Sequence, residues 1–371
     1  MQHIASVLIF GYIVLAVITF YFGTHIRGRI IFLNVLYGLC LIYCISVGVF
    51  FLKSVPDEVL GGSVATPALN MSIYFLAIVG LQYIGWSRIN RSRPWLHLLY
   101  LATITGLPLF TYIFTIQNKE AMAALSSVVC FFGLIRYCER RRGLFTFIIL
   151  AAGMVGNILS KPSSATICCI MLFIILVSTI IKERNLKTAL PKEFFFTLPA
   201  YVCAFIFAPD NKMVRTMELL NPEVQKHMAI SILAFEILWC MPILFIIPTV
   251  RKFAKDLSLL VVAGWMAICI AFIYQTSPGI ELEMVTVHFG LFIAMHYVPF
   301  IGIFGLAAAF VAEGLIAENG FDPDTEVTTI PGDIKTYSRR LLYNHLIYFL
   351  VLGFAFVLFF GNFPFFLVMA G

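Results

Sequence analysis

The sequence predicts an all-α, polytopic transmembrane helical protein with about 12 helices. Composition is the first reason: 61% of the 371 residues are hydrophobic and only 12% are charged. Soluble domains carry roughly 45–50% apolar and about 25% charged residues, so this composition excludes a soluble enzyme, a disordered chain and a nucleic-acid-binding domain. The second reason is the length of the apolar runs, many of which approach the roughly 20 residues that a helix needs to cross a bilayer.

These apolar runs account for most of the chain and leave only short connections between them. They cover residues 5–23, 30–52, 68–86, 97–115, 121–136, 144–159, 164–181, 194–208, 228–249, 257–276, 286–312 and 345–368. We therefore predict a single transmembrane domain over residues 1–371, in which a polar cytoplasmic loop, 313–344, precedes a final helix, 345–368. The run 286–312 is open to two interpretations, because Pro299 could break it into a re-entrant piece and a shorter span.

The distribution of lysine and arginine predicts the orientation. Loops that stay in the cytoplasm during insertion are enriched in these residues. If the N-terminus lies outside, the loops on the cytoplasmic side contain 19 of the 25 basic residues, and the alternation holds along the whole chain. We expect an integral, multi-pass protein of the bacterial inner membrane with both termini on the extracytoplasmic side.

Polar residues that could carry chemistry gather in the loops assigned to the outer side, while the common motifs of soluble enzymes are absent. Asp57 and Glu58 lie in one such loop, Lys119 and Glu120 begin another, and the stretch Asn157–Ser164 forms a third. A carboxylate can take the proton of an acceptor hydroxyl or hold a divalent cation, and a lysine can hold a phosphate.

Several short motifs, in a constant order, resemble those of the GT-C membrane glycosyltransferases. They are Asn118–Leu125, the basic turn Arg140–Arg142, the turn Leu159-Ser-Lys-Pro162 and the stretch Tyr297-Val-Pro-Phe-Ile-Gly302. The similarity is greatest to O-mannosyltransferases linked to tetratricopeptide repeats and to their bacterial relatives. It covers about residues 97–312 and implies a GT-C-like core over about residues 30–312.

The resemblance implies a membrane glycosyltransferase that takes a sugar from a polyprenyl-phosphate donor on the extracytoplasmic face. Asp57 and Glu58 would then be catalytic, as general base or as ligands of a divalent cation. Lys119, Ser160 and Lys161 would bind the donor phosphate. The expected partner is accordingly a membrane lipid or a polyprenyl-phosphate sugar, and no nucleic acid is expected.

The sequence also departs from this family. The long acidic first outer loop of family members is replaced by one of about fifteen residues around Asp57. Asn118 and His296 stand where the family has arginine, and no tetratricopeptide repeats follow the core. The shortened loop favours a non-catalytic membrane subunit or scaffold that binds membrane protein partners in a larger complex, whereas the outer turn Ser160-Lys161-Pro162 disfavours it.

Three further polar residues keep another function open. Glu236 is the only acid inside a predicted span, so it is a candidate proton carrier of a transporter, a structural hydrogen-bonding group or part of a sugar site. His288 and His296 are eight residues apart, about 80° around a helix, and could face one pocket. Heme ligation would need a second histidine pair on another helix, which the sequence lacks.

Overall fold

The computed structural model describes residues 29–54, 65–105, 118–206, 237–238, 240–275, 297–318 and 334–360. All regular secondary structure in these ranges is helical, which confirms the all-α prediction for the described part of the chain. The helices are α2 (Arg29–Ser54), α3 (Ala65–Arg88), α4 (Pro94–Thr105), α6 (Asn118–Cys138), α7 (Leu144–Ser160), α8 (Pro162–Glu183), α9 (Leu186–Ala189), α10 (Lys192–Phe195), α11 (Leu198–Ile206), the 3-10 helix η2 (Met241–Ile246), α14 (Pro248–Ala254), α15 (Leu257–Gln275), α17 (Tyr297–Glu318) and α18 (Ile334–Phe360).

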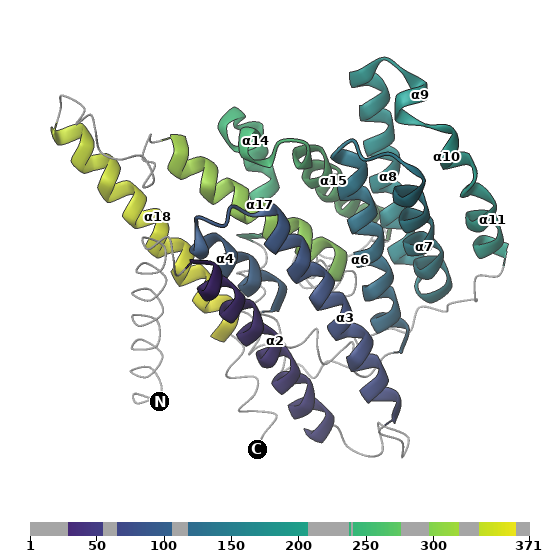
Figure 1. Ribbon diagram of the computed structural model, residues 1–371, viewed down its shortest axis with the longest axis horizontal. Helices are drawn as coiled ribbons and strands as arrows, with labels where there is room; N and C mark the ends of the chain where they lie inside the picture. Colours follow the sequence, from purple (N-terminus) through teal and green to yellow (C-terminus); the bar gives the residue numbers. More distant parts are fainter. Residues whose placement is uncertain are drawn as a thin grey trace.

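Successive long helices run in opposite directions, as Figure 1 shows. The turns 89–93, 139–143 and 184–185, and the turn between α14 and α15, therefore lie at one end of the bundle, which we call the basic end. The start of α6 and the turn between α7 and α8 lie at the other end, which we call the opposite end. The names follow the arginines and lysines that the sequence places in the first set of turns.

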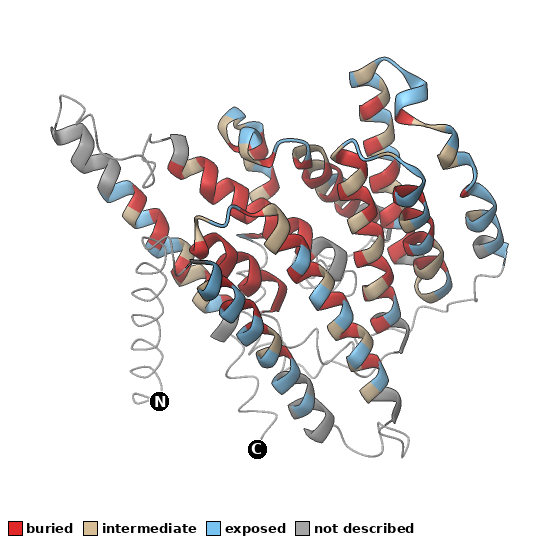
Figure 2. Ribbon diagram, in the orientation of Figure 1, coloured by how far each residue is buried: buried red, intermediate tan, exposed pale blue. Residues whose placement is uncertain are grey.

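The core is built around α4 and α17. Every residue of α4 is buried, and α4 packs against α2, α3, α17 and α18 (Figure 2). The ring of Tyr100 on α4 fits between two glycines: a Cβ on Gly85 would lie 2.3 Å from it and one on Gly305 2.8 Å from it. Its hydroxyl donates a hydrogen bond of 2.8 Å to the carbonyl of Leu81. The two glycines thus let α3 and α17 approach α4 closely enough to enclose a large aromatic ring.

Several helices turn large apolar side chains outward, as expected of a protein that lies in lipid. On α2 these side chains include Ile31, Leu39 and Ile42, and on α18 they include Leu350. Three helical segments are long and apolar enough to cross a membrane, namely Ala68–Arg88, Ala121–Cys138 and Ser164–Glu183. A fourth span is possible by the same criteria if Pro248–Ala254 and Leu257–Ala271, which are bent by 107°, count together. The chain is therefore a membrane protein.

Helix boundaries differ from the predicted spans at two places where prolines interrupt the apolar runs. The predicted span 228–249 ends, in its described part, as the 3-10 helix η2 followed by α14, and Pro242 and Pro248 stand at the starts of these two elements. Proline lacks a backbone N–H and clashes with the preceding turn, so it begins a helix more readily than it continues one.

Two other boundaries also differ from the prediction. The predicted span 194–208 is divided at 196–197 between α10 and α11, and Pro199 is the second residue of α11, as Pro242 is of η2. The polar loop predicted over 313–344 is shorter, because α17 extends to Glu318 and α18 already begins at Ile334. The buried position of Glu313 explains the extension of α17: its carboxylate finds hydrogen-bonding partners inside the bundle, as described below.

Candidate functional site

The structure describes only part of the predicted site. Five of the candidate residues lie outside the described residues: Asp57, Glu58, Glu236, His288 and His296. Lys119 and Glu120 belong to the first turn of α6, where only the backbone is described. Ser160 and Lys161 are described in full, at the turn between α7 and α8.

Helix topology brings the two candidate lysines to one end of the bundle. The helices α6 and α7 pack side by side and are joined by the short turn 139–143, and α8 packs against both. The start of α6, the end of α7 and the start of α8 consequently meet at the opposite end, far from the basic turns (Figure 1). Lys119, as the second residue of α6, and Lys161, between α7 and α8, therefore share this end.

The backbone of Lys161 is held from both sides. It is extended, with φ −149° and ψ 93°, and Lys161 is both the C-cap of α7 and the N-cap of α8. Its N–H donates to the carbonyl of Asn157 at 2.7 Å, and its carbonyl accepts from the N–H groups of Ser164 at 3.0 Å and Ala165 at 3.2 Å. Because Pro162 opens α8 with a fixed φ, the direction of the chain after Lys161 is also set.

The hydroxyl of Ser160 points back to its own helix. It donates to the carbonyl of Gly156 at 2.6 Å. A serine hydroxyl has a single hydrogen to donate, so in this arrangement only its lone pairs are free, and these do not bind an anionic phosphate. The geometry therefore favours Lys161 over Ser160 as a phosphate ligand.

A buried hydrogen bond between α6 and α7 lies next to this turn. One of its two residues, Asn157, belongs to a stretch that the sequence pattern assigns to an outer loop, and this assignment is wrong for Asn157. Asn157 lies inside α7 and is fully buried. Its side-chain oxygen accepts a 2.8 Å hydrogen bond from the hydroxyl of Ser127 on α6, and its amide nitrogen donates to the carbonyl of Gly153 at 3.0 Å. The same residue thus links α6 to α7 through its side chain and positions Lys161 through its backbone.

Small residues allow these two helices to approach closely. A Cβ placed on Gly156 would lie 2.3 Å from the Ser126 hydroxyl oxygen, and one on Gly153 would lie 2.4 Å from the backbone nitrogen of Cys130. Close packing of small residues is the usual means by which membrane helices associate. The spacing Gly153-x-x-Gly156 beside Asn157 is the sequence signal that could have indicated this buried contact.

Replacing Ser127 by alanine should lower the free energy of unfolding by about 1 kcal/mol, since it leaves the buried Asn157 amide oxygen without its donor. The matched control is Ser46→Ala, because the Ser46 hydroxyl is exposed and bonds only to the carbonyl of Ile42 in its own helix. Denaturation of both variants in mixed detergent micelles measures the difference. Equal stability of the two variants would show that the interhelical bond contributes nothing.

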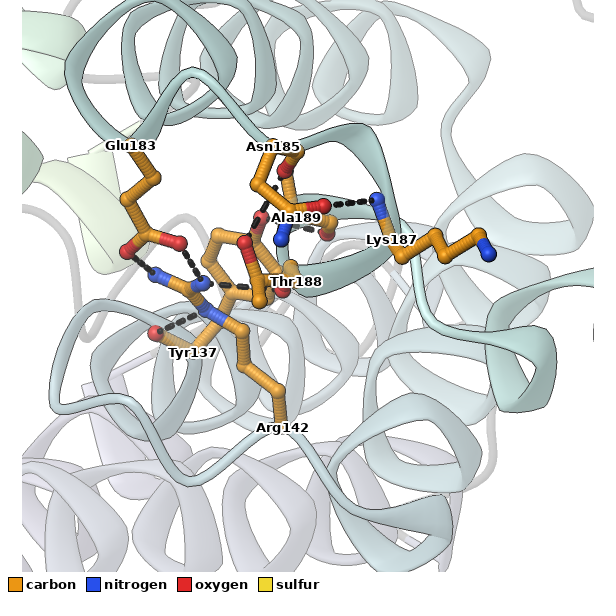
Figure 3. Close-up of polar contacts among 7 residues, drawn as sticks. All are labelled: Tyr137, Arg142, Glu183, Asn185, Lys187, Thr188 and Ala189. Carbon is orange, nitrogen blue, oxygen red and sulfur yellow. Dashed lines mark hydrogen bonds and ion pairs between the residues drawn. The ribbon is translucent and has the colours of Figure 1, made fainter.

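The basic end is held by charged side chains rather than by small residues. Arg142 forms two hydrogen bonds with the carboxylate of Glu183, of 2.8 and 2.9 Å, which join the start of α7 to the end of α8 (Figure 3). These bonds raise the pKa of the Arg142 guanidinium above its ordinary value. Arg88 at the end of α3 donates to Glu139 at 2.9 Å and so joins α3 to the turn after α6.

Glu313 is a buried member of this end that the sequence did not single out. It accepts a 3.1 Å hydrogen bond from the side chain of Asn90, and the guanidinium of Arg93 lies 3.9 Å away. A buried carboxylate is stable only with such partners. These contacts hold α17 against the turn before α4. The sequence alone predicts a polar loop that begins at Glu313. It does not reveal the partners of this residue, because they lie more than two hundred residues away.

A second buried polar pair lies between α2 and α4. The hydroxyl of Tyr37 and the Nδ1 atom of His97 are 2.9 Å apart, and both side chains are buried. Trp86 packs against Tyr37 edge-on, with ring centroids 5.6 Å apart. This pair fixes the position of α2 on the core and is not near the turn that contains Lys161.

Among the described residues, no group of three or more histidine, cysteine, aspartate or glutamate side chains could hold a metal ion. Comparisons of the chain with protein-family models, with curated proteins and with solved structures find no match. The fold thus defines an α-helical membrane protein with two chemically distinct ends. Lys119 and Lys161 lie at helix starts of the opposite end, away from the turns of the basic end.

Proposed function

We propose that this protein is a membrane glycosyltransferase with a GT-C-like core of about 12 helices, which takes a sugar from a polyprenyl-phosphate donor at the opposite end of the bundle. Under this proposal the basic end faces the cytoplasm of a bacterial inner membrane, because cytoplasmic loops retain lysine and arginine. The opposite end and both termini would then face outward.

The observation that carries this proposal is the common location of two lysine-bearing helix starts. Both α6 and α8 begin at the opposite end, with Lys119 in the first turn of one and Lys161 as the N-cap of the other. A helix start carries a partial positive charge, which favours phosphate. Two such starts with two lysines, on helices that pack together, supply positive charge for one anionic headgroup.

The reaction assigned to this end is a displacement at the anomeric carbon of the donor sugar. The acceptor hydroxyl oxygen forms a bond to that carbon, and the bond from the carbon to the phosphate oxygen breaks, so polyprenyl phosphate leaves with the electron pair. Asp57 or Glu58 takes the hydroxyl proton as general base. In the alternative role these carboxylates would hold a divalent cation, which would supply positive charge to the donor phosphate. Lys161 and Lys119 stabilise the leaving phosphate.

The test uses the full chain in proteoliposomes with radiolabelled polyprenyl-phosphate mannose or glucose as donor and a membrane extract as acceptor source. We expect Lys161→Ala to raise the KM for the donor on the order of tenfold, the effect of losing one charged hydrogen bond. The double variant Asp57→Asn/Glu58→Gln should lower kcat by about 100-fold or more. The control is Lys252→Ala, which removes an exposed lysine at the basic end.

Transfer that survives the double carboxylate substitution, or equal KM values for Lys161→Ala and Lys252→Ala, would refute the proposal. The same preparation distinguishes the two other functions that the sequence leaves open. A membrane subunit shows no transfer and co-purifies with stoichiometric protein partners. A transporter shows proton uptake that depends on Glu236 and no sugar transfer.

A further inference from the structure

We propose that residues 182–198, which we call the interfacial segment, form a docking surface for the anionic headgroups of phospholipids. The segment begins with the last two residues of the candidate span Ser164–Glu183 and includes α9 and α10. This inference is independent of the glycosyltransferase proposal, because it concerns the basic end of the bundle and uses none of the residues assigned to sugar transfer.

The position of the segment follows from the helices on either side of it. After α8 ends, Arg184 adopts a left-handed conformation, with φ 51° and ψ 23°, which reverses the chain. The side chain of Asn185 then accepts a 3.0 Å hydrogen bond from the N–H of Lys187 and so begins α9. At the far end, the apolar helix α11 returns along the edge of the bundle (Figure 1). A segment between the end of a span and a returning apolar helix lies at the level of the membrane surface.

Two hydrogen bonds fix this segment on the bundle. Arg142, already paired with Glu183, also donates to the carbonyl of Thr188 at 2.9 Å. The hydroxyl of Tyr137 donates to the carbonyl of Ala189 at 2.7 Å. Figure 3 shows these contacts on one side of α9, whereas the side chain of Lys187 points away from them. The backbone of the segment is therefore held in place, while the side chain of Lys187 is directed away from the contacts that hold it.

The exposed charges of the segment are mainly positive. Lys182, Arg184, Lys187 and Lys192 are exposed, and none of them forms an ion pair among the described residues. The acids of the segment are Glu183, whose charge is matched by Arg142, and Glu193. A surface with this balance attracts anions, and each basic residue near an anionic bilayer adds to the attraction.

Exposed apolar side chains lie beside these cations. Phe194 turns inward, with its ring centroid 5.7 Å from that of Phe147 on α7. Phe195 and Phe196 instead face outward, and Phe196 is 74% exposed. Leu186 on α9 is exposed as well. Phenylalanine and leucine next to lysine are typical of segments that insert their apolar groups at the boundary between headgroups and acyl chains.

Together these features favour a bilayer over an acidic protein as the occupant. The segment is covalently continuous with a span, so a membrane surface is always within reach of it. An acidic protein would neutralise the lysines but would not need the exposed phenylalanines to lie next to lipid. The predicted ligand is therefore the phosphate of an anionic phospholipid, with the two phenylalanines in the acyl region beneath it.

The experiment titrates the full chain in detergent with phosphatidylglycerol or phosphatidylcholine and measures bound lipid by native mass spectrometry. We expect phosphatidylglycerol to bind more tightly, and Lys187→Gln/Lys192→Gln to weaken it by about fivefold for each lysine. The variant Phe195→Ser/Phe196→Ser should weaken both lipids. The matched control is Lys252→Gln/Lys255→Gln, two exposed lysines at the same end but away from the phenylalanines. It should change phosphatidylglycerol binding by less than about twofold.

Four results would overturn the proposal. The first two are equal affinity for the two lipids and equal losses in the two lysine variants. The third is tight binding of poly-glutamate without a preference for phosphatidylglycerol, which would assign the surface to an acidic protein. The fourth is displacement of phosphatidylglycerol by free inorganic phosphate at equal concentration, which would show that the site takes phosphate without needing a lipid. Circular dichroism of each variant confirms that the helices are retained.

Discussion

Replacing Gly153 by alanine should lower the free energy of unfolding by about 3 kcal/mol, the upper part of the range for overpacking a well-packed core. The added Cβ would lie 2.4 Å from the backbone nitrogen and 2.7 Å from the Cα of Cys130 on α6. A backbone cannot rotate away as a side chain can, so α6 and α7 must separate. The measurement is unfolding in mixed detergent micelles, followed by circular dichroism.

The control for this substitution is Gly38→Ala on α2, where nothing lies within 4 Å of the new Cβ. There alanine should be neutral or stabilise by up to about 1 kcal/mol, because it has the higher helix propensity. If Gly153→Ala were as stable as Gly38→Ala, the close approach of α6 and α7 would be incorrect. A loss of stability at Gly153 should also weaken donor binding, since α7 carries the turn with Lys161.

Replacing Arg142 by glutamine should lower the free energy of unfolding by about 2 kcal/mol, the range for hydrogen bonds to charged groups. The guanidinium bonds Glu183 through two nitrogens and the Thr188 carbonyl through one of them, and it lies 4.7 Å above the Tyr137 ring. The carboxylate and the carbonyl lose their donor, and the ring loses the cation above it. Since Arg142 is 13% exposed, water can replace only part of what is lost.

The matched control is Arg141→Gln. Arg141 is 63% exposed, and its guanidinium lies 3.9 Å from Glu139, so its removal should change stability by less than about 0.5 kcal/mol. A double-mutant cycle with Glu183→Gln isolates the pair, and its coupling energy should be at least about 1 kcal/mol. Zero coupling would show that Arg142 acts only through Thr188 and Tyr137.

The general character of the fold could be predicted from the sequence because it depends on composition and apolar run length. Neither requires knowledge of which residues touch. The alternation of basic and neutral loops also predicts that the turns around Arg88, Arg142 and Lys255 lie at the same end of the bundle, as Figure 1 shows for these turns. Basic loops mark one side of the membrane, so they indicate the direction in which each helix crosses it. Boundaries were less accurate where prolines change local geometry, as at Pro242 and Pro248.

The candidate site was predicted less completely. The sequence singled out Lys119 and Lys161, and the helices place their backbones at the same end. It misjudged Asn157, which looks like a loop residue beside Ser160 but is enclosed between α6 and α7. A polar residue near the end of an apolar run gives the same sequence pattern whether its side chain faces water or a neighbouring helix. The pattern describes one segment and carries no information about the helix that packs against it.

By itself the sequence determined that this chain is an α-helical membrane protein with positive charge gathered on alternate turns, because hydrophobicity and charge act on each segment separately. Only the tertiary structure decided which polar groups are paired. Arg142 meets Glu183, Asn90 meets Glu313 and Ser127 meets Asn157 across separations of 41, 223 and 30 residues. Such pairs depend on which helix faces stack together, and that is a property of the packed bundle rather than of any one segment.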